Sequence, residues 1–410
     1  MTNFLNKSGD VRITNALVFD GQDPELVERD VIIRDGLIVS ADEDDQDGVI
    51  AGPIIDARGG VVTPGFIDAH FHAYAESLNM WRNESRLPSY LALVGAGRLR
   101  RALGRGFTTV RDVAGGDIGL HRAIELGLID SPRYFYSGAA LSQTGGHGDP
   151  TAQDATLCFH GGPTLEVVDG ADNLRVAVRT RLRSGAHAIK IMASGGVISP
   201  VDPIRIPQYS AEEIQAVTDE AIRQQSYVVA HAYSSAAIEH VVANGVRSVE
   251  HGNLLNAETA AIMATHGAFL VPTLITYDAM NRRGVEYGLT DVGLAKNSEV
   301  LEYGRNAIEL ASQAGVSVGF GSDLMGDLED EQLGGLRLQA EVVGVLETLR
   351  SVTSVNAALL RKDSLGRIRP GGVGDVLIFA GNPLERAELL WDESSRIVVQ
   401  AGVRVGTASS

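Results

Sequence analysis

From Thr63 to about residue 365, short apolar segments alternate with longer segments of helical pattern, and no other feature constrains the fold of this chain as strongly. Eight of the apolar segments have the length and composition of strands. They are GFIDAHFH, FTTVRDVA, RYFYSGAAL, AIKIMASGG, SYVVAHAYS, RSVEHGN, AFLVPTLI and VSVGFGSDL. Strands separated by crossover helices pair in parallel, so the pattern indicates an α/β fold. The alternation therefore predicts a closed TIM-like (β/α)8 barrel over residues 63–365.

The segments between the expected strands carry the sequence signs of helix ends. Ser210 followed by Glu213 forms a capping box at the start of residues 210–226. The segment 258–267 ends at Gly267, and glycine commonly terminates helices. Both segments are therefore predicted as crossover helices.

Both ends of the chain follow a different pattern. In the first sixty residues, short runs of alternating apolar and polar side chains lie between glycine, aspartate and proline, which predicts antiparallel strands. Short strand-like runs return after about residue 365. We infer that the strands of both ends pair in one small β-sandwich. The expected organisation is an N-terminal part of this sandwich over residues 1–62, the barrel over residues 63–365 and a C-terminal part over residues 366–410.

Composition narrows the class of protein and its partners. Of the 410 residues, 44% are hydrophobic and 21% are charged, which is typical of a soluble globular protein. The net charge of −17 disfavours nucleic acid and anionic lipid as partners. The first residues lack a signal-peptide pattern, and no stretch of about 20 apolar residues is free of charges. We therefore expect no membrane span and a cytoplasmic location.

Polar residues that can bind a metal stand at the ends of several expected strands. They are His70 and His72 on the first strand, Lys190 on the fourth, His231 on the fifth, His251 on the sixth and Asp323 on the eighth. Residues two apart in a strand point to the same side, so His70 and His72 face one site. Barrel enzymes place their chemistry at the carboxyl ends of the strands, so these ligands are predicted to converge. The single cysteine, Cys158, excludes a thiolate cluster, so nitrogen and oxygen must hold any metal.

Lys190 lies among apolar residues in AIKIMASGG, in a chain that is poor in lysine. Burying an unpaired ammonium costs several kcal/mol. A buried lysine readily loses its proton, and carbon dioxide can carboxylate the free amine to give an anionic oxygen ligand. Such a ligand could bridge two divalent cations. The alternative is an ion pair between Lys190 and a neighbouring acidic residue.

These motifs resemble those of the amidohydrolase superfamily of metal-dependent hydrolases, in its binuclear form. PGFIDAHFH is similar to the motif of the first strand, AIKIMASGG to the strand of the carboxylated lysine, AHAY and VEHGN to the strands with single histidines, and GFGSD to the strand of the final aspartate. NAALLRKDSLGRIRPGGVGDVLIF is similar to the segment that leads back into the sandwich. TGGHGD and KIMASGG resemble the prolidase-like branch, which includes Xaa-Pro dipeptidases, carboxypeptidases acting on basic residues and ochratoxin-type amidases.

The resemblance implies a role for each candidate ligand. His70, His72 and Asp323 would bind the more buried of two divalent cations, His231 and His251 would bind the more exposed one, and carboxylated Lys190 would bridge them. Zinc is the expected ion, with manganese, cobalt or iron as alternatives. A hydroxide that bridges both ions would attack the scissile carbonyl. Asp323 would accept the proton of the water and deliver it to the leaving nitrogen.

Two further residues are candidates for contact with the substrate. Tyr233 lies two positions after His231 on the same face, so its hydroxyl could donate to the carbonyl oxygen as negative charge develops. The alternative for Tyr233 is a position at the rim of the site. His147 follows the third expected strand in QTGGHGD, and the resemblance implies that it binds a substrate carboxylate or carbonyl. The alternative for His147 is a solvated loop histidine.

Other polar residues receive weaker functional or structural assignments. Arg205, from the loop SPVDPIRIPQYS, is a candidate for substrate binding, and Tyr209 of the same loop could also contact the substrate, but solvated loop residues are the safer interpretation of both. Arg111 and Asp112 are expected to form a structural pair. Five histidines are expected to be core or surface groups: His121, His160, His187, His240 and His266.

The sequence thus predicts a metal-dependent hydrolase that cleaves an amide bond in a small molecule, either a dipeptide or an N-acyl amino acid. Carbamate, ester or lactone substrates stay open, because the same hydroxide attacks any polarised carbonyl. A mononuclear deaminase is a further alternative, although it has no need of a bridging Lys190. A non-catalytic scaffold or a ligand-binding barrel would not need the full ligand set. Related barrels usually assemble, which implies a homo-oligomer.

Overall fold

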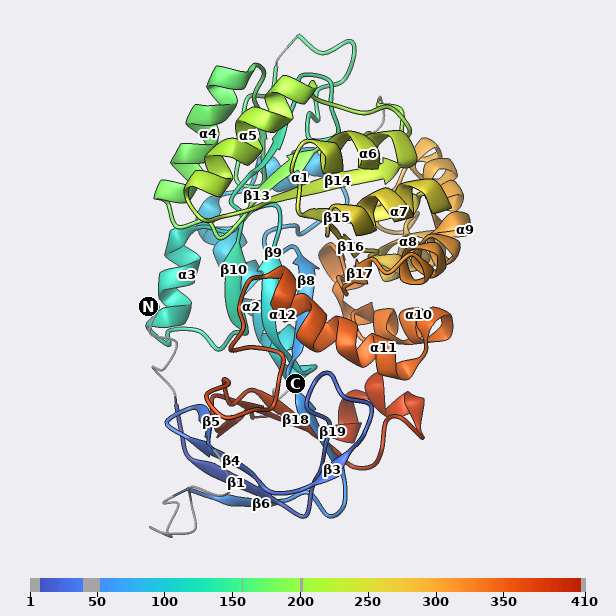
Figure 1. Ribbon diagram of the computed structural model, residues 1–410. Coiled ribbons are helices and arrows are strands. Elements are labelled where there is room, and N and C mark those ends of the chain that lie inside the picture. Colours follow the sequence, from blue (N-terminus) through green and yellow to red (C-terminus); the bar gives the residue numbers. More distant parts are fainter. Residues whose placement is uncertain (1–7, 40–51, 157, 200–201, 407–410) are drawn as a thin grey trace.

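The computed structural model describes residues 8–39, 52–156, 158–199 and 202–406. The main part of the molecule consists of parallel strands covered by helices (Figure 1). A three-stranded parallel sheet has the order β10-β9-β8, with β8 at Phe66–Phe71, β9 at Phe107–Asp112 and β10 at Arg133–Tyr136. A seven-stranded parallel sheet has the order β12-β11-β13-β14-β15-β16-β17. Its strands are β11 (Ala140–Ser142), β12 (Leu165–Val167), β13 (Ile189–Met192), β14 (Val228–Ser234), β15 (Ser248–Leu254), β16 (Phe269–Val271) and β17 (Ser317–Val318). The fold is therefore of the α/β class.

Backbone hydrogen bonds join both edges of the three-stranded sheet to the seven-stranded sheet. The amide of Ala69 in β8 donates to the carbonyl of Phe320, just beyond β17, at 2.9 Å. At the other edge, the amide of His187, just before β13, donates to the carbonyl of Tyr136 in β10 at 2.8 Å. The carboxyl ends of the parallel strands therefore meet at one end of the α/β part.

Helices lie on the outside of the parallel strands (Figure 1). They are α1 (Met80–Glu84), α2 (Pro88–Gly104), α3 (Ile118–Glu125), α4 (Ala171–Arg183), α5 (Ala211–Arg223), α6 (Ser235–Ala243), α7 (Ala257–Thr265), α8 (Leu274–Arg283), α9 (Asp291–Gln313), α10 (Gly334–Val343), α11 (Val345–Arg350) and α12 (Asn356–Leu359). The predicted capping box is present at α5, where Ser210 Oγ accepts from the Glu213 amide at 3.3 Å and Glu213 Oε2 accepts from the Ser210 amide at 2.8 Å. None of the described helices combines the length and the apolar character that crossing a membrane requires.

Strands from both ends of the chain form a separate two-layered unit (Figure 1, bottom). The first layer has the order β5-β4-β1-β6, from β1 (Val11–Thr14), β4 (Val31–Arg34), β5 (Leu37–Val39) and β6 (Ile54–Asp56). The second has the order β20-β19-β18-β7-β2-β3, from β2 (Leu17–Val18), β3 (Val27–Glu28), β7 (Val61–Pro64), β18 (Val376–Phe379), β19 (Arg396–Gln400) and β20 (Val403–Arg404). One hydrophobic cluster contains Ile13 and Ile33 from the first layer and Val62 and Val376 from the second, so the layers pack on one another.

The structure corrects several details of the sequence prediction. The terminal strands are not all antiparallel, because β1 pairs with β6 and β2 pairs with β7 in parallel. The segment RYFYSGAAL forms two strands, β10 and β11, with a turn at Gly138 (φ 73°) between them. The segment AFLVPTLI ends as a strand at Val271, and Leu274 already begins α8. In VSVGFGSDL only Ser317–Val318 is a strand. The short strand β12 has no counterpart in the sequence prediction.

Candidate metal centre

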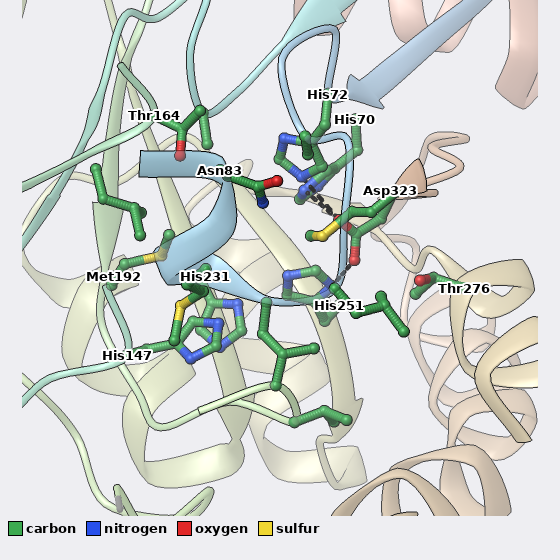
Figure 2. A pocket seen from close by; sticks show the side chains of 18 of the residues that line it. His70, His72, Asn83, His147, Thr164, Met192, His231, His251, Thr276 and Asp323 are labelled. Atoms are coloured by element: carbon green, nitrogen blue, oxygen red, sulfur yellow. Dashed lines mark hydrogen bonds and ion pairs between the residues drawn. The ribbon is translucent and has the colours of Figure 1, made fainter. Parts of the chain in front are cut away.

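A cavity lies at the carboxyl ends of the parallel strands. All six predicted metal ligands line it: His70, His72, Lys190, His231, His251 and Asp323. His147 and Tyr233, the predicted substrate contacts, line it as well. Figure 2 shows the imidazoles and the carboxylate of Asp323 turned toward the same space. The structure therefore brings together residues that are up to about 250 positions apart in the chain.

Strand register explains why these side chains meet. His231 in β14 pairs with Met192 of β13, two residues after Lys190, and His251 in β15 pairs with Ala232 of β14. At the other side of the cavity, the amide of Asp323 donates to the carbonyl of His70 at 2.8 Å. Parallel strands in this register end at a common level, so their last inward side chains share one cavity.

His70, His72 and Asp323 form the first half of the centre. Nε2 of His72 lies 2.8 Å from Oδ1 of Asp323, and Nε2 of His70 lies 3.3 Å from the same oxygen. His70, His251 and Asp323 also offer ligand atoms that all lie within 4.8 Å of one another, which is close enough to surround one cation. Burial alone would raise the pKa of Asp323, but His70 and His72 hold it well below its usual value. Asp323 is therefore a carboxylate, the form that binds a metal.

The backbone is strained at one wall of this centre. His251 and Asp323 have positive φ angles of 73° and 53°, and so does Thr273, with 44°. Oγ1 of Thr273 lies 2.8 Å from Nδ1 of His251, so the three strained residues belong to one cluster. Left-handed conformations at residues other than glycine cost about 1–3 kcal/mol each and persist where the surrounding structure enforces them. Such strain concentrates at functional sites, which supports a functional role for this wall.

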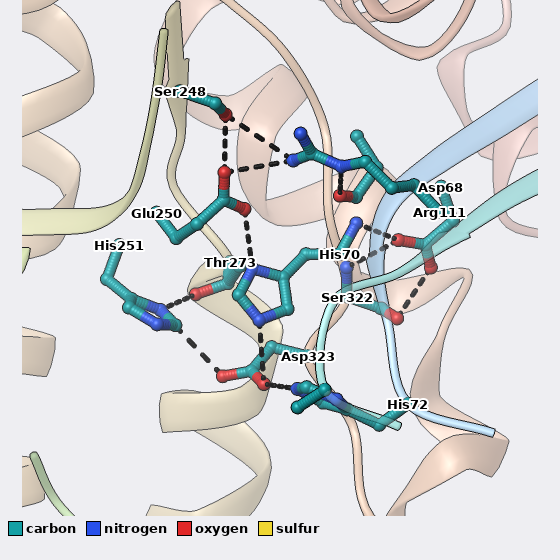
Figure 3. A network of polar contacts seen from close by, with 12 residues as sticks. Asp68, His70, His72, Arg111, Ser248, Glu250, His251, Thr273, Ser322 and Asp323 are labelled. Carbon is teal, nitrogen blue, oxygen red and sulfur yellow. Dashed lines mark hydrogen bonds and ion pairs between the residues drawn. The ribbon is translucent and has the colours of Figure 1, made fainter. Parts of the chain in front are cut away.

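A buried glutamate orients His70 (Figure 3). Oε2 of Glu250 lies 2.6 Å from Nδ1 of His70, and Oε1 accepts from Nη2 of Arg111 at 2.9 Å. Burial would raise the pKa of Glu250, but Arg111 and His70 hold it far below its usual value, so Glu250 is ionised. The Nδ1–H of His70 therefore donates a hydrogen bond to Glu250, and this contact turns Nε2 toward Asp323 and the cavity.

The pair expected between Arg111 and Asp112 is wrong. Neighbouring residues of a strand point to opposite faces, so Arg111 reaches Glu250 on one side of β9. On the other side, Asp112 accepts hydrogen bonds from the Tyr134 hydroxyl at 2.7 Å and the Ala73 amide at 3.0 Å. Sequence reasoning missed Glu250, although an acidic residue inside an apolar strand, directly before His251, is a pattern that could have identified it.

A second buried carboxylate fixes the segment that carries Asp323. Asp68 in β8 accepts from the Ser322 hydroxyl at 2.6 Å and from Nε2 of Gln332 at 2.8 Å. It also accepts from the amides of His70 and Ser322, at 3.0 and 3.1 Å. These bonds tie β8 to the chain just before Asp323, so they keep His70 and Asp323 side by side.

Lys190 lies in the cavity wall and is only 1% exposed. Its Nζ forms no hydrogen bond or ion pair with the residues that the structure describes, so the alternative of an acidic partner is not found there. Burial lowers the pKa of Lys190 to about 8, which makes the neutral amine accessible near neutral pH. The donor set of four imidazoles and one carboxylate fits divalent cations such as zinc, and the buried unpaired amine fits carboxylation.

His231 and His251 form the second half of the centre. Their ring centroids are 4.6 Å apart, and the ring of His147 stacks on that of His231 at 4.3 Å. Burial lowers the pKa of His231 and of His251 well below the usual value, so both imidazoles are neutral, as metal binding requires. His147 is held by Ser199, whose Oγ lies 2.8 Å from Nδ1.

Two tyrosines connect the cavity wall to His251. The hydroxyl of Tyr233 lies 2.9 Å from that of Tyr277, and the Tyr277 hydroxyl lies 2.8 Å from Nδ1 of His251. Tyr277 belongs to α8 and also lines the cavity, but no motif of the sequence singled it out. The chain of hydroxyl groups couples a predicted metal ligand to a predicted substrate contact.

Arg205, the predicted substrate contact of the loop after the fourth expected strand, is not among the residues that line the cavity. Its side chain is 60% exposed, and Nε donates to Oε1 of Glu299 in α9 at 2.9 Å. Tyr209 is buried, and its hydroxyl donates to the carbonyl of Val168 at 3.0 Å. Positions 200 and 201 of the same loop lie outside the described residues. None of the five histidines assigned to core or surface roles lines the cavity.

Comparisons with known proteins agree with this arrangement. Residues 61–404 match the model of the amidohydrolase family. The chain is 33% identical over 341 residues to ochratoxinase of Aspergillus niger, an alignment that covers 78% of this chain and 70% of that protein. Among solved structures, a prolidase complexed with N-methylphosphonate-L-proline is 43% identical, with a TM-score of 0.91, and the match covers 97% of this chain and 99% of the prolidase. The structure of the Aspergillus niger ochratoxinase has 28% identity and a TM-score of 0.84, covering 97% of this chain and 95% of that chain.

Proposed function

The chain belongs to the amidohydrolase family, in its prolidase-like branch, and from this premise we propose that it cleaves the amide bond of dipeptides or N-acyl amino acids. One observation carries the proposal: four buried imidazoles, the carboxylate of Asp323 and the unpaired amine of Lys190 line a single cavity. The relatives named above include an ochratoxinase and a prolidase, which supports an amide as the bond that is cleaved.

We infer that the fold carries this site in the way the sequence predicts. The two parallel sheets would together form one (β/α)8 barrel, because backbone hydrogen bonds join both edges of the three-stranded sheet to the seven-stranded sheet. The two-layered terminal unit would be the β-sandwich. In such a barrel, catalytic groups belong at the carboxyl ends of the strands, where the cavity lies.

We propose that the centre holds two divalent cations, with zinc as the expected ion. The first would be held by His70, His72 and Asp323, the second by His231 and His251, and both by carboxylated Lys190. Bound there, the ions would supply a water activated at neutral pH and a polarised scissile carbonyl.

The residues of the chain would move the proton and orient the substrate. Asp323, which is ionised, would accept the proton of the attacking water at its carboxylate and deliver it to the leaving nitrogen. Tyr233 would donate its hydroxyl proton to the carbonyl oxygen as negative charge develops there. His147, stacked on His231, would bind a carboxylate or carbonyl of the substrate. Glu250 would keep Nε2 of His70 directed at the site by accepting a hydrogen bond from its Nδ1–H.

A substrate screen on the zinc-loaded protein tests this function. Dipeptides and N-acyl amino acids that vary in the leaving amino acid are expected to be cleaved, with activity lost on chelation and restored by zinc. If the protein hydrolysed carbamates, esters or lactones but none of the amides, this result would contradict the proposed bond type. A mononuclear deaminase would release ammonia and would hold about one ion per chain rather than two.

The homo-oligomer stays a prediction. Light scattering coupled to size-exclusion chromatography checks it, and a monomer at all concentrations would contradict it.

A further inference from the structure

Methionine is concentrated around the cavity. Four of the six methionines of the chain line it: Met80, Met192, Met280 and Met325. Met80 and Met192 belong, together with Ala114 and Leu165, to a small hydrophobic cluster that is separate from the larger cluster containing Met280. We call Met80, Ala114, Leu165 and Met192 the apolar lobe. Figure 2 shows Met192 and Thr164 on one side of the predicted metal ligands and Thr276 on the other, so the lobe forms one side of the cavity.

A buried hydrogen-bond acceptor without a partner belongs to a residue that lines the cavity beside this lobe. Asn83 of α1 lines the cavity and is 4% exposed. Its Nδ2 donates to the carbonyl of Ser77 at 2.9 Å. A carbonyl can only accept, so this bond determines the orientation of the amide and leaves Oδ1 facing elsewhere. Oδ1 is buried and has no partner among the described residues. Buried polar groups are almost always paired, so the unpaired Oδ1 can still accept a hydrogen bond.

The lobe offers no partner for a charged group. Lys190 and Asp323 are the lysine and the carboxylate that line the cavity, and both are assigned to the metal centre. The nearby carboxylate of Glu84 accepts from the hydroxyl and the backbone amide of Thr164, and Glu84 does not line the cavity. An ammonium or a carboxylate that entered the lobe would therefore lose its water without gaining a counter-ion.

We propose that the apolar lobe is the subsite for a bulky, uncharged side chain of the substrate, an inference that rests on the proposed function. In this arrangement, Oδ1 of Asn83 accepts a hydrogen bond from an N–H of the same substrate residue. Methionine side chains adapt to several shapes, so the lobe discriminates by charge more than by shape. The net charge of −17 would favour cationic substrates at long range, but the lobe excludes them at close range.

Norleucine and lysine provide a matched test, because both side chains are unbranched chains of four carbons and lysine adds a terminal ammonium group. Dipeptides with either residue in the first or the second position, and alanine in the other, are given to the zinc-loaded full chain. At the position that occupies the lobe, we expect kcat/KM to be about 100-fold higher for norleucine. Equal values at both positions, or a preference for lysine, would overturn the proposal.

Binding of the free amino acids separates this proposal from the proposed function. If no amide is cleaved, the hydrolase function fails, but calorimetry with free norleucine and lysine still decides on the lobe. Tighter binding of norleucine supports an uncharged subsite. Equal binding, or tighter binding of lysine, overturns it.

Substitutions at Met80 locate the effect in the lobe. Met80 is the first residue of α1, where an acidic side chain is compatible with the helix dipole. Met80→Glu is expected to move the norleucine-to-lysine ratio of kcat/KM by about tenfold toward lysine, and the neutral isostere Met80→Gln is the control. An unchanged ratio in a folded Met80→Glu protein would contradict the assignment.

Two substitutions at Asn83 test the acceptor. Asn83→Leu and Asn83→Asp both remove the donor to Ser77, but Asn83→Asp keeps an acceptor oxygen. For the norleucine substrate, we expect kcat/KM of Asn83→Leu to lie about tenfold below that of Asn83→Asp. Equal values would show that Oδ1 binds no substrate N–H.

Discussion

The two halves of the metal centre are held in different ways. In the half around His70, the contacts are charge-assisted and buried, because Glu250 binds His70 on one side and Arg111 on the other. In the half around His251, hydroxyl groups make the shortest contacts, because Tyr277 and Thr273 both lie 2.8 Å from Nδ1, while Oδ2 of Asp323 is 3.8 Å away. Hydrogen bonds to ionised groups are roughly twice as strong as neutral ones. The side chains of the first half are therefore held more strongly than those of the second half. We call the contacts of His70 with Glu250 and of Glu250 with Arg111 the anchor.

This difference agrees with the separate roles that we propose for the two halves of the centre. The residues that would touch the substrate, His147 and Tyr233, pack on His231 and His251 of the second half. The first half contacts the carboxylates of Asp323 and Glu250 at shorter distances, 3.3 Å and 2.6 Å from His70. The strongly held half would fix the cations, and the weakly held half would adapt to the substrate. Lys190 is expected to join the two halves, so its loss should affect both.

The largest effect is expected for Lys190→Ala. Removal of the bridging group should release metal from both halves and lower kcat/KM by about 1000-fold or more, because the ions contribute several kcal/mol of transition-state stabilisation. Metal analysis and substrate assays check this, and short carboxylates added to the protein should restore part of the activity. Lys362→Ala, a change of the same type outside the cavity, should keep both. Full metal retention in Lys190→Ala without added carboxylate would contradict the bridge.

Asp323→Asn separates proton transfer from metal binding in the first half. The amide keeps an oxygen ligand but cannot accept the proton, so kcat should fall by about 10²–10⁴-fold while most of the metal stays bound. Steady-state kinetics on protein of known metal content measure this effect. The exposed Asp327, changed to asparagine, is the control. Near-normal turnover would refute the role of Asp323.

Glu250→Gln weakens the anchor without touching a ligand. Loss of the carboxylate that orients His70 should lower metal affinity by about 10–100-fold, as measured by competition with a chelator. Asp375→Asn disrupts a buried pair between Asp375, next to β18 of the terminal unit, and Arg133 of β10, and it is the matched control, which should lose stability but keep its metal affinity. Equal metal affinities in the two variants would show that Glu250 supports only the fold.

Tyr277→Phe tests the weaker contacts of the second half and should have the smallest effect. Loss of the hydroxyl between His251 and Tyr233 is expected to lower kcat by about tenfold, with the metal content unchanged. Tyr287→Phe removes a hydroxyl that binds Arg283 outside the cavity, and it should leave kcat unaltered. A larger loss of metal in Tyr277→Phe than in Glu250→Gln would reverse the comparison between the two halves.

The meeting of the candidate ligands in one cavity could be predicted because strand periodicity is local. The His-x-His spacing places His70 and His72 on one face from the sequence alone, and the strand ends place the remaining ligands at a common level. The supporting contacts could not be predicted, because they join residues far apart in the chain. Glu250 reaches His70 across 180 positions, and Arg111 prefers this distant glutamate to its neighbour Asp112.

Incorrect element boundaries in the sequence prediction also left a residue of the cavity without an assigned role. Because AFLVPTLI has the apolar character of a strand throughout, the start of α8 at Leu274 was not evident, and Tyr277 in its first turns received no role. Arg205 has the residue type of a carboxylate binder, but its partner Glu299 lies in α9, 94 positions away. Loop side chains are positioned by tertiary contacts of this kind, which a single sequence does not reveal.

Zinc content with and without bicarbonate tests the central claim most directly. If carboxylated Lys190 bridges two ions, protein equilibrated with zinc and bicarbonate should retain about two ions per chain, and protein depleted of carbon dioxide should retain fewer. One ion per chain under both conditions would contradict a bridged pair of cations in this cavity.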